Sequence, residues 1–216
     1  MGSIYYFVGH GGYYALGAAA LWGIYCVILV WTRVSQKRFR SEAEQDQFLD
    51  SVDVHLRQGD FESIEALCEG NTRAVPMMIA LAVKNRKLDP EKLESWIMDR
   101  FQFDVLSDIE SRITWISTLI KASPMLGLIG TVAGMMGAFN TLETAVAEEP
   151  TKQLLADIRM ALEHTLIGLL ITVTLLLCMA FINNRIRHME ELAVFGMNRF
   201  FDGLREVPQN RKLRVR

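Results

Sequence analysis

Three long stretches of this sequence carry no charged residue, and they constrain the fold more than any other feature. They cover residues 13–31, 122–142 and 165–182. At 1.5 Å per residue, a helix of each length crosses nearly all of a hydrocarbon core of about 30 Å. Hydrophobic residues make up 50% of the 216-residue chain, so aqueous segments must accompany these stretches. We therefore expect an all-α integral membrane protein with three transmembrane helices.

The charges that flank these stretches predict an orientation. No Lys or Arg precedes the first stretch, whereas four follow it, at Arg33, Lys37, Arg38 and Arg40. The third stretch is likewise followed by Arg185 and Arg187, and the connection before it is mostly acidic, with Glu143, Glu148, Glu149, Asp157 and Glu163. By the positive-inside rule the N-terminus lies outside and the C-terminus in the cytoplasm. A cleaved signal peptide needs a basic region before its apolar core, which is missing, so we expect a retained anchor.

These patterns divide the chain into six predicted segments. Residues 1–34 form the outside N-terminus and first transmembrane helix, and residues 35–121 a cytoplasmic helical domain broken at Gly59 and Gly70. Residues 91–120 lack Gly and Pro, so a long helix should run from the cytoplasm into the second span at 122–142. Residues 143–160 are an outside connection in which the third helix begins, near Pro150. Residues 161–184 are the third span, and 185–216 a cytoplasmic helix and tail.

The second span has its glycines on one helical face. Gly127, Gly130, Gly134 and Gly137 are spaced three, four and three residues apart, a pattern typical of membrane helices that pack closely. Thr131 lies beside this stripe. A packing seam with the threonine bonded to its own backbone accounts for the spacing without any further role.

Glu163 and His164 lie at the outer end of the third span. Glu163 is four residues after Arg159, which is the spacing of a helical ion pair. We interpret the two residues as a solvated helix mouth. A buried relay is the alternative, since an ionisable residue near a membrane core is a functional candidate.

Several classes of function have no support in the sequence. No P-loop, Rossmann fingerprint, GxSxG or CxxC motif occurs, so we expect no enzyme and no catalytic residue. The cysteines (Cys26, Cys68 and Cys178) and the four histidines show no metal-ligand spacing, so we expect no metal and no cofactor. The net charge of −2 and the absence of a basic stripe with aromatics argue against nucleic acid as a partner.

Three motifs resemble one known family over nearly the whole chain. SPMLGLIGTVAGMMGAF at residues 123–139 is similar to the second-helix signature of the MotA/TolQ/ExbB proton-channel family. ALEHTLIGLLITV at residues 161–173 is similar to its third-helix stretch, and LRQGDFESIEALC at residues 56–68 resembles a cytoplasmic helix pair. Within the family the chain resembles the ExbB/TolQ branch.

The resemblance implies roles for particular residues. Thr131 and Thr165 occupy the positions of two pore-facing threonines, and Thr172 lies one further heptad along the same face. The glycines implied to pack around the pore are Gly127, Gly130, Gly134 and Gly168. Two positions depart from the family pattern, because Met160 replaces a frequent glutamate and Thr174 a usual proline. Glu163 is a candidate for the pore mouth.

None of the three apolar stretches contains Asp, Glu, Lys, Arg or His, so no group within them exchanges a proton near neutral pH. The resemblance implies that a single-span ExbD/TolR-like partner supplies a membrane aspartate inside a ring of these subunits, a homo-oligomer expected to be a pentamer. It also implies a bacterial inner-membrane location, work driven by the proton motive force, and a TonB- or TolA-like envelope effector. The alternatives are a non-conducting membrane scaffold and, with no catalytic cluster to support it, a membrane enzyme.

Overall fold

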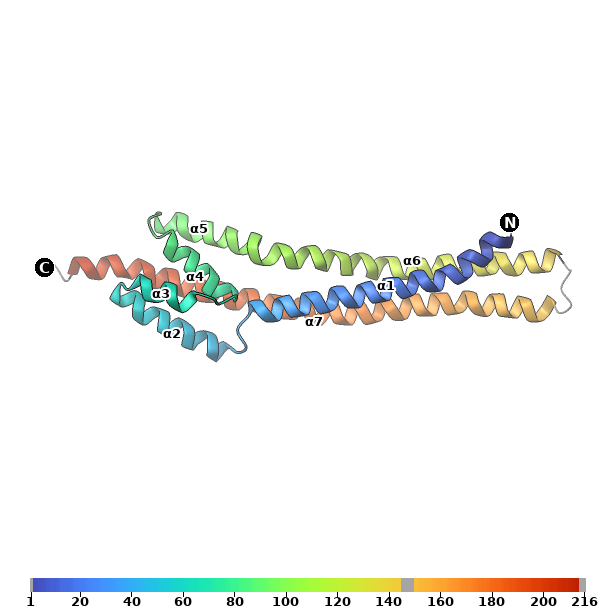
Figure 1. The fold of residues 1–216 in the computed structure, drawn as a ribbon, viewed down its shortest axis with the longest axis horizontal. Helices are drawn as coiled ribbons and strands as arrows, with labels where there is room; N and C mark the ends of the chain where they lie inside the picture. Colours follow the sequence, from blue (N-terminus) through green and yellow to red (C-terminus); the bar gives the residue numbers. More distant parts are fainter. Residues whose placement is uncertain (1, 145–149, 214–216) are drawn as a thin grey trace. The chain divides into compact units, whose positions relative to one another are not determined.

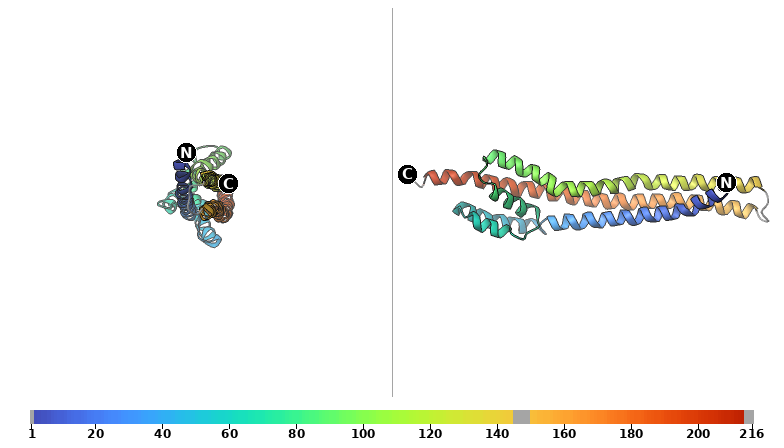
Figure 2. Two further views of the ribbon diagram at one scale, coloured as in Figure 1. Left: turned by 90° about the vertical axis from the view of Figure 1, so that its right-hand side faces the viewer. Right: turned by 45° about the horizontal axis from the view of Figure 1, so that its top comes forward.

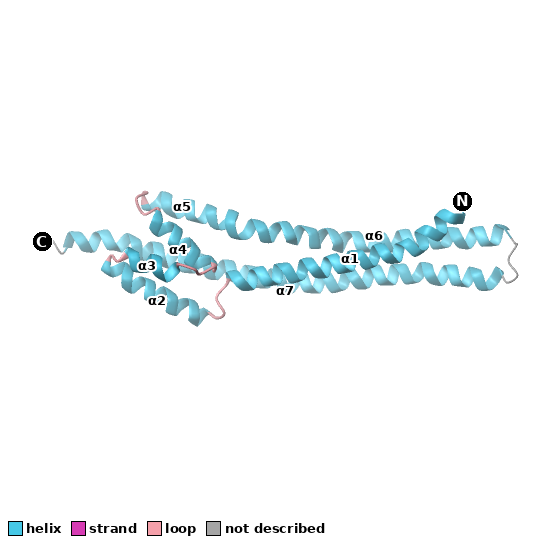
Figure 3. Ribbon diagram, viewed as in Figure 1, coloured by secondary structure: helices cyan, strands magenta, loops and turns pink. Residues whose placement is uncertain are grey.

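The computed structural model describes residues 2–144 and 150–213, and all regular structure in those ranges is helical (Figure 1, Figure 3). The elements in chain order are α1 (Gly2–Lys37), α2 (Glu42–Gln58), α3 (Phe61–Cys68), α4 (Ala74–Lys84), α5 (Pro90–Phe101), the π-helix η1 (Gln102–Leu106), α6 (Ser107–Thr144) and α7 (Pro150–Leu213). The all-α prediction is confirmed. The predicted start of the third long helix at Pro150 is also confirmed, whereas Glu148 and Glu149 of the expected connection lie outside the described residues.

Contacts divide the chain into two units, each described by itself. The first contains α1 as far as Leu29, α6 from Arg112 and α7 as far as Phe181. Its three helices lie side by side in both views of Figure 2 as in Figure 1. The second contains Val30–Ser111 and α7 from Ile182.

The first unit has apolar side chains on its surface and small residues at many of its helix contacts. Its large exposed side chains include Leu128, Phe139, Leu166, Leu170 and Leu177, whereas Ala19, Ala133, Ala138 and Ala161 are buried. This distribution is typical of helices that pack through small residues while lipid covers their outer faces. Three helical stretches, within Gly11–Gln58, Pro90–Asn140 and Leu154–Glu206, are long and apolar enough to cross a membrane, as the sequence predicts.

The second unit packs short helices around an ordinary apolar core. Its buried side chains include Leu49, Val52, Leu56, Ile64, Met78, Ile79, Leu93, Ile97, Met197 and Phe200. Gly59 ends α2 in the left-handed conformation, with φ of 73°, and Asp60 then caps α3 by accepting from the backbone N–H of Ser63. The predicted breaks at Gly59 and Gly70 are confirmed.

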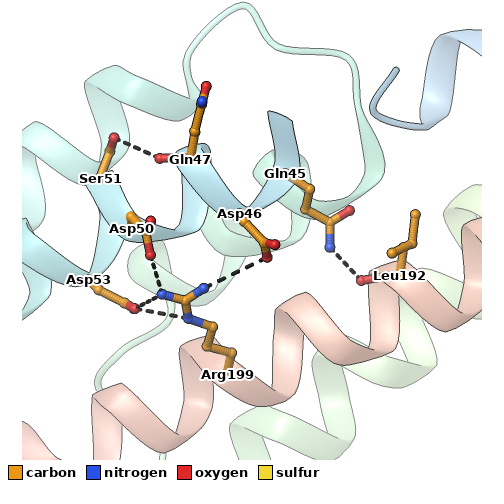
Figure 4. Close-up of polar contacts among 8 residues, drawn as sticks. All are labelled: Gln45, Asp46, Gln47, Asp50, Ser51, Asp53, Leu192 and Arg199. Carbon is orange, nitrogen blue, oxygen red and sulfur yellow. Dashed lines mark hydrogen bonds and ion pairs between the residues drawn. The ribbon is translucent and has the colours of Figure 1, made fainter. Parts of the chain in front are cut away.

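Arg199 of α7 holds α2 in this unit (Figure 4). Its guanidinium donates to Asp53 at 2.7 and 3.0 Å and to Asp50 at 2.5 Å, and Asp46 lies 3.9 Å away. These aspartates are spaced four and three residues apart, so they share one face of α2. Next to them, the buried Gln45 side chain donates to the carbonyl of Leu192 at 2.7 Å. The polar contacts therefore fix the register of α2 along α7.

The helical path after Pro90 reaches α6 as predicted, but it passes through the π-helix η1. No glycine or proline marks this position, so the sequence pattern predicts a regular α-helix there. A π segment adds a residue to one turn, which rotates the side chains that follow it.

Candidate functional site

Glycines bring the backbones of α6 and α7 into close contact in the first unit. A Cβ placed on Gly168 would lie 2.6 Å from the carbonyl oxygen of Ser123, and one placed on Gly127 would lie 2.9 Å from that of His164. These neighbours are backbone atoms, which cannot swing away as a flexible side chain does. The two backbones therefore approach at a distance that a side chain on either glycine forbids.

This line of contact between the glycines of α6 and α7, called the seam below, continues toward the end of the unit that contains Glu163. A Cβ on Gly130 would meet the Cβ and Cγ of His164 at 2.6 Å, and one on Gly134 would meet the Cβ of Ala161 at 2.6 Å. Gly137 is looser, since its nearest neighbour would be an Asp157 oxygen at 3.9 Å. The tight part of the seam thus runs from Gly168 to Gly134.

Thr131 and Thr165 meet inside this seam. Their hydroxyl oxygens lie 3.2 Å apart, one from α6 and one from α7. Thr131 also donates to the carbonyl of Leu128 at 2.8 Å, and Thr165 lies 3.3 Å from the carbonyl of Gly127. A hydroxyl has one proton, so when Thr131 donates to Leu128 its oxygen is free to accept from Thr165. The pair forms a short polar chain between two helices.

Thr172 joins the helices at a second point, next to a proline. Pro124 has no N–H, so the carbonyl of Ile120 lacks its helical donor. The Thr172 hydroxyl lies 3.4 Å from that carbonyl and 2.9 Å from the carbonyl of Gly168 in its own helix. Serine and threonine hydroxyls commonly satisfy backbone groups freed by proline in membrane helices. The Thr172 side chain therefore bonds to backbone carbonyls of both helices.

Glu163 forms a three-residue bridge with α1. Its carboxylate accepts from the Tyr13 hydroxyl at 2.9 Å and from Nε of Arg159 at 2.8 Å. The Glu163 side chain is 43% exposed, which suits the expected mouth position. Sequence reasoning did not identify Tyr13, because the residue lies 150 positions before Glu163 and no local pattern links them.

His164 is buried, so its interpretation as part of a solvated mouth is wrong. The residue is 1% exposed, its ring lies 4.0 Å from the ring of Tyr13, and its Nδ1 lies 2.7 Å from the carbonyl of Met160. Because α1 covers this face of α7, a residue one position after the exposed Glu163 is enclosed. One sequence signal could have predicted the burial of His164. Its position in the helical register of α7 matches the glycine face of α6.

The two positions that depart from the family pattern have ordinary surroundings. Met160 is partly exposed and supplies the carbonyl that His164 contacts. Thr174 is exposed, and its hydroxyl donates to the carbonyl of Leu170 at 2.8 Å. Among the described residues, no contact joins the side chain of Met160 or Thr174 to the Thr131–Thr165 pair.

The arrangement can bind a polar group but cannot by itself exchange a proton at the threonines. Hydroxyls and carbonyls donate or accept hydrogen bonds and hold water, yet they do not ionise near neutral pH. The helices of this unit thus define a multi-pass membrane protein with a polar seam inside its span.

Comparison with known proteins identifies the family of this chain. The model of the MotA/TolQ/ExbB proton channel family matches residues 68–209, which include the whole seam. The chain therefore belongs to the MotA/TolQ/ExbB proton channel family. A protein of Methanothermobacter thermautotrophicus (strain Delta H), whose name describes it as a biopolymer transport protein ExbB homolog, is 28% identical over 166 residues. The match covers 76% of this chain, and the chain spans 57% of the length of that relative.

Proposed function

We propose that this protein is the proton-channel subunit of an ExbB/ExbD- or TolQ/TolR-like motor in the bacterial inner membrane. The motor converts proton motive force into mechanical work on an envelope partner of the TonB or TolA kind. The subunit is no enzyme and needs no cofactor. The observation that carries the proposal is the contact between the hydroxyls of Thr131 and Thr165, 3.2 Å apart in apolar stretches that hold no Asp, Glu, Lys, Arg or His.

The seam supports different roles for this chain and for its partner. Thr131, Thr165 and Thr172 supply hydroxyls along one line of contact, and Gly127, Gly130, Gly134 and Gly168 let the helices approach closely enough to present them. The proton carrier is then a carboxylate from another chain, a single-span ExbD/TolR-like protein with a membrane aspartate. A ring of five copies of this chain would enclose that partner.

The driving force is sufficient for stepwise movement. One elementary charge that crosses a potential of 100 mV releases about 2.3 kcal/mol, enough to shift two closely balanced states by more than tenfold. Protonation removes the charge of the partner's carboxylate and so changes its preferred contact with the threonines. With the N-terminus outside and the C-terminus in the cytoplasm, as the basic residues after the first and third spans favour, protons enter from the side of Glu163.

A non-conducting scaffold is the second candidate. It is favoured by the glycine seam, which explains tight packing without any proton transfer, and by Thr172, whose hydroxyl bonds only backbone carbonyls among the described contacts. A scaffold needs the shape of the threonines and not their hydroxyls. The two candidates therefore differ in their response to removal of the hydroxyls at constant volume.

The test is proton flux in membrane vesicles that contain the full chain and a single-span partner with one membrane aspartate, read with a pH-sensitive dye trapped inside. Thr131→Val or Thr165→Val should lower the flux by roughly tenfold, the effect of losing a hydrogen bond of about 1–2 kcal/mol, and serine should restore it. Thr174→Val is the matched control, because this hydroxyl is exposed and bonds its own helix. Full flux in both Thr131→Val and Thr165→Val, with normal assembly, would contradict the channel role and favour the scaffold.

A further inference from the structure

His164 is a buried ionisable residue for which the proposed mechanism has no use. It is 1% exposed in a unit that lipid surrounds, where an imidazole is costly unless its polar atoms are bonded. Its Nδ1 lies 2.7 Å from the carbonyl of Met160, and since a carbonyl only accepts, Nδ1 carries the hydrogen. Its ring packs on Tyr13, with 4.0 Å between the ring centres.

The imidazole lies in a slot made by glycines of two other helices. A Cβ on Gly12 of α1 would lie 2.8 Å from Nε2 of His164, and a Cβ on Gly130 of α6 would lie 2.6 Å from its Cβ and Cγ. Any side chain at either position displaces the ring. One residue of α7 therefore touches both neighbouring helices at positions where they have no side chain.

On α6 and on α7, the residue at the slot is the sequence neighbour of a threonine of the pair. Gly130 directly precedes Thr131, and His164 directly precedes Thr165. A contact that fixes Gly130 against His164 therefore fixes the backbone on which both hydroxyls are mounted. The hydroxyls lie 3.2 Å apart, so a shift of a few tenths of an ångström separates them beyond hydrogen-bond distance.

We propose that His164 is the positioning residue of the threonine pair, an imidazole clamp that joins α1, α6 and α7 and sets the distance between Thr131 and Thr165. It acts through its shape and its hydrogen bond to Met160, and it is not a carrier of the proton. Only the predicted effect of His164 on proton flux rests on the proposed function. The effect of His164 on the distance between Thr131 and Thr165 can be measured separately.

The geometry is tested by disulfide formation in the full chain. Thr131→Cys and Thr165→Cys are introduced together after the three native cysteines are replaced by alanine, oxidation is started by adding copper(II) phenanthroline and air, and the disulfide is quantified in membranes by mass spectrometry. His164→Ala should slow its formation roughly tenfold or more, because near-contact reactions are steeply sensitive to misplacement. His164→Asn keeps a donor for the Met160 carbonyl and should recover part of the rate. Leu162→Ala, at a position 63% exposed on the same helix, should leave the rate unchanged.

A second comparison keeps the test valid if His164→Ala folds poorly. Gly12→Ala should slow the disulfide in the chain that keeps His164, because the added methyl enters the imidazole, whereas Gly17→Ala, whose Cβ meets nothing within 4 Å, should leave the rate unchanged. Equal rates in Gly12→Ala and Gly17→Ala, or unchanged disulfide formation in a folded His164→Ala chain, overturn the clamp.

Proton flux distinguishes positioning from proton transfer. Among the described residues the imidazole packs on Tyr13 of α1, Tyr13 donates to Glu163, Glu163 pairs with Arg159, and α6 has no ionisable side chain between Lys121 and Glu143. His164→Asn should therefore lower flux without moving its pH midpoint, and a shifted midpoint would make His164 a relay and refute the proposal. If the unsubstituted chain carries no flux, the proposed function fails while the disulfide result still judges the clamp.

Discussion

Replacing Gly168 by alanine should separate α6 from α7 and break the threonine pair. The new Cβ would lie 2.6 Å from the carbonyl oxygen of Ser123, against 3.4 Å for the onset of ordinary contact, a shortfall of about 0.8 Å. Both Ser123 and Gly168 are buried, and the obstructing atom belongs to the backbone. The helices must therefore move apart, since neither partner can rotate out of the way.

The size of the effect follows from these distances. If the helices separate by that shortfall, the hydroxyl oxygens of Thr131 and Thr165 move from 3.2 Å to about 4.0 Å, beyond hydrogen-bond range. Overpacking of this kind costs about 1–3 kcal/mol. Alanine regains up to about 1 kcal/mol over glycine in helix propensity. With the full propensity gain the net loss of stability should be about 0–2 kcal/mol, and the loss relative to a glycine-to-alanine change without overpacking should be about 1–3 kcal/mol.

The measurement is unfolding of the chain in mixed micelles by increasing SDS, followed by tryptophan fluorescence, in parallel with proton flux. Gly17→Ala is the matched control, because a Cβ at this exposed position of α1 meets nothing within 4 Å, so only the propensity gain applies. Gly168→Ala should unfold at lower SDS than the unsubstituted chain, and Gly17→Ala at equal or higher SDS. If Gly168→Ala proves as stable as Gly17→Ala, the helices do not approach as described.

Three further predictions concern the second unit. Arg199→Ala should destabilise it by about 1 kcal/mol, measured by thermal unfolding, because three aspartates of α2 lose their shared cation, and Arg199→Lys should restore only part of this. Hydrogen bonds from the Ser63 side chain and backbone hold the pKa of Asp60 below its usual value, so its stabilising contribution is present above that usual value and is lost as pH falls through the lowered one. Asp60→Ala should therefore weaken the dependence of unfolding on pH in acid. Burial raises the pKa of the Cys68 thiol to about 11, so maleimide should label folded Cys68 far more slowly than Leu67→Cys, at a 41% exposed neighbour.

Much of the first unit could be predicted because membrane helices leave strong local signals. Long uncharged stretches identify the spans, and the glycine spacing identifies the packed face of α6, since small residues at helical intervals have few other uses in lipid. The caps at Gly59 and Asp60 were equally accessible, because a left-handed cap and an N-cap depend on adjacent residues. In each case the interactions that determine the structure join residues within one or two helical turns of each other.

The contacts that local patterns did not reveal join distant parts of the chain. The bond from Tyr13 to Glu163 and the enclosure of His164 depend on where α1 packs, and a helical wheel of α7 alone places His164 near the exposed Glu163. The π-helix at Gln102–Leu106 has no local breaker residue, so periodicity could not predict it. Burial by another helix is a tertiary property that periodicity does not encode.

The polar groups of α7 within the first unit are unevenly distributed, and in the motor proposed above this determines where the carboxylate of the proposed partner would reside. Glu163, His164 and Thr165 lie between Arg159 and Thr172, which are 13 residues and therefore about 20 Å apart along the helix. From Val173 to Phe181 the one hydroxyl, that of Thr174, is exposed and bonds its own helix. A carboxylate that moves along this seam would therefore find hydrogen-bond donors toward Glu163 and apolar side chains beyond Thr172. In its charged form it should favour the threonines, and only after protonation should it tolerate the apolar part, because an unpaired charge in lipid is costly. In the motor proposed above, the threonines of α7 would therefore couple protonation of the partner's carboxylate to its position, although their hydroxyls carry no acid themselves.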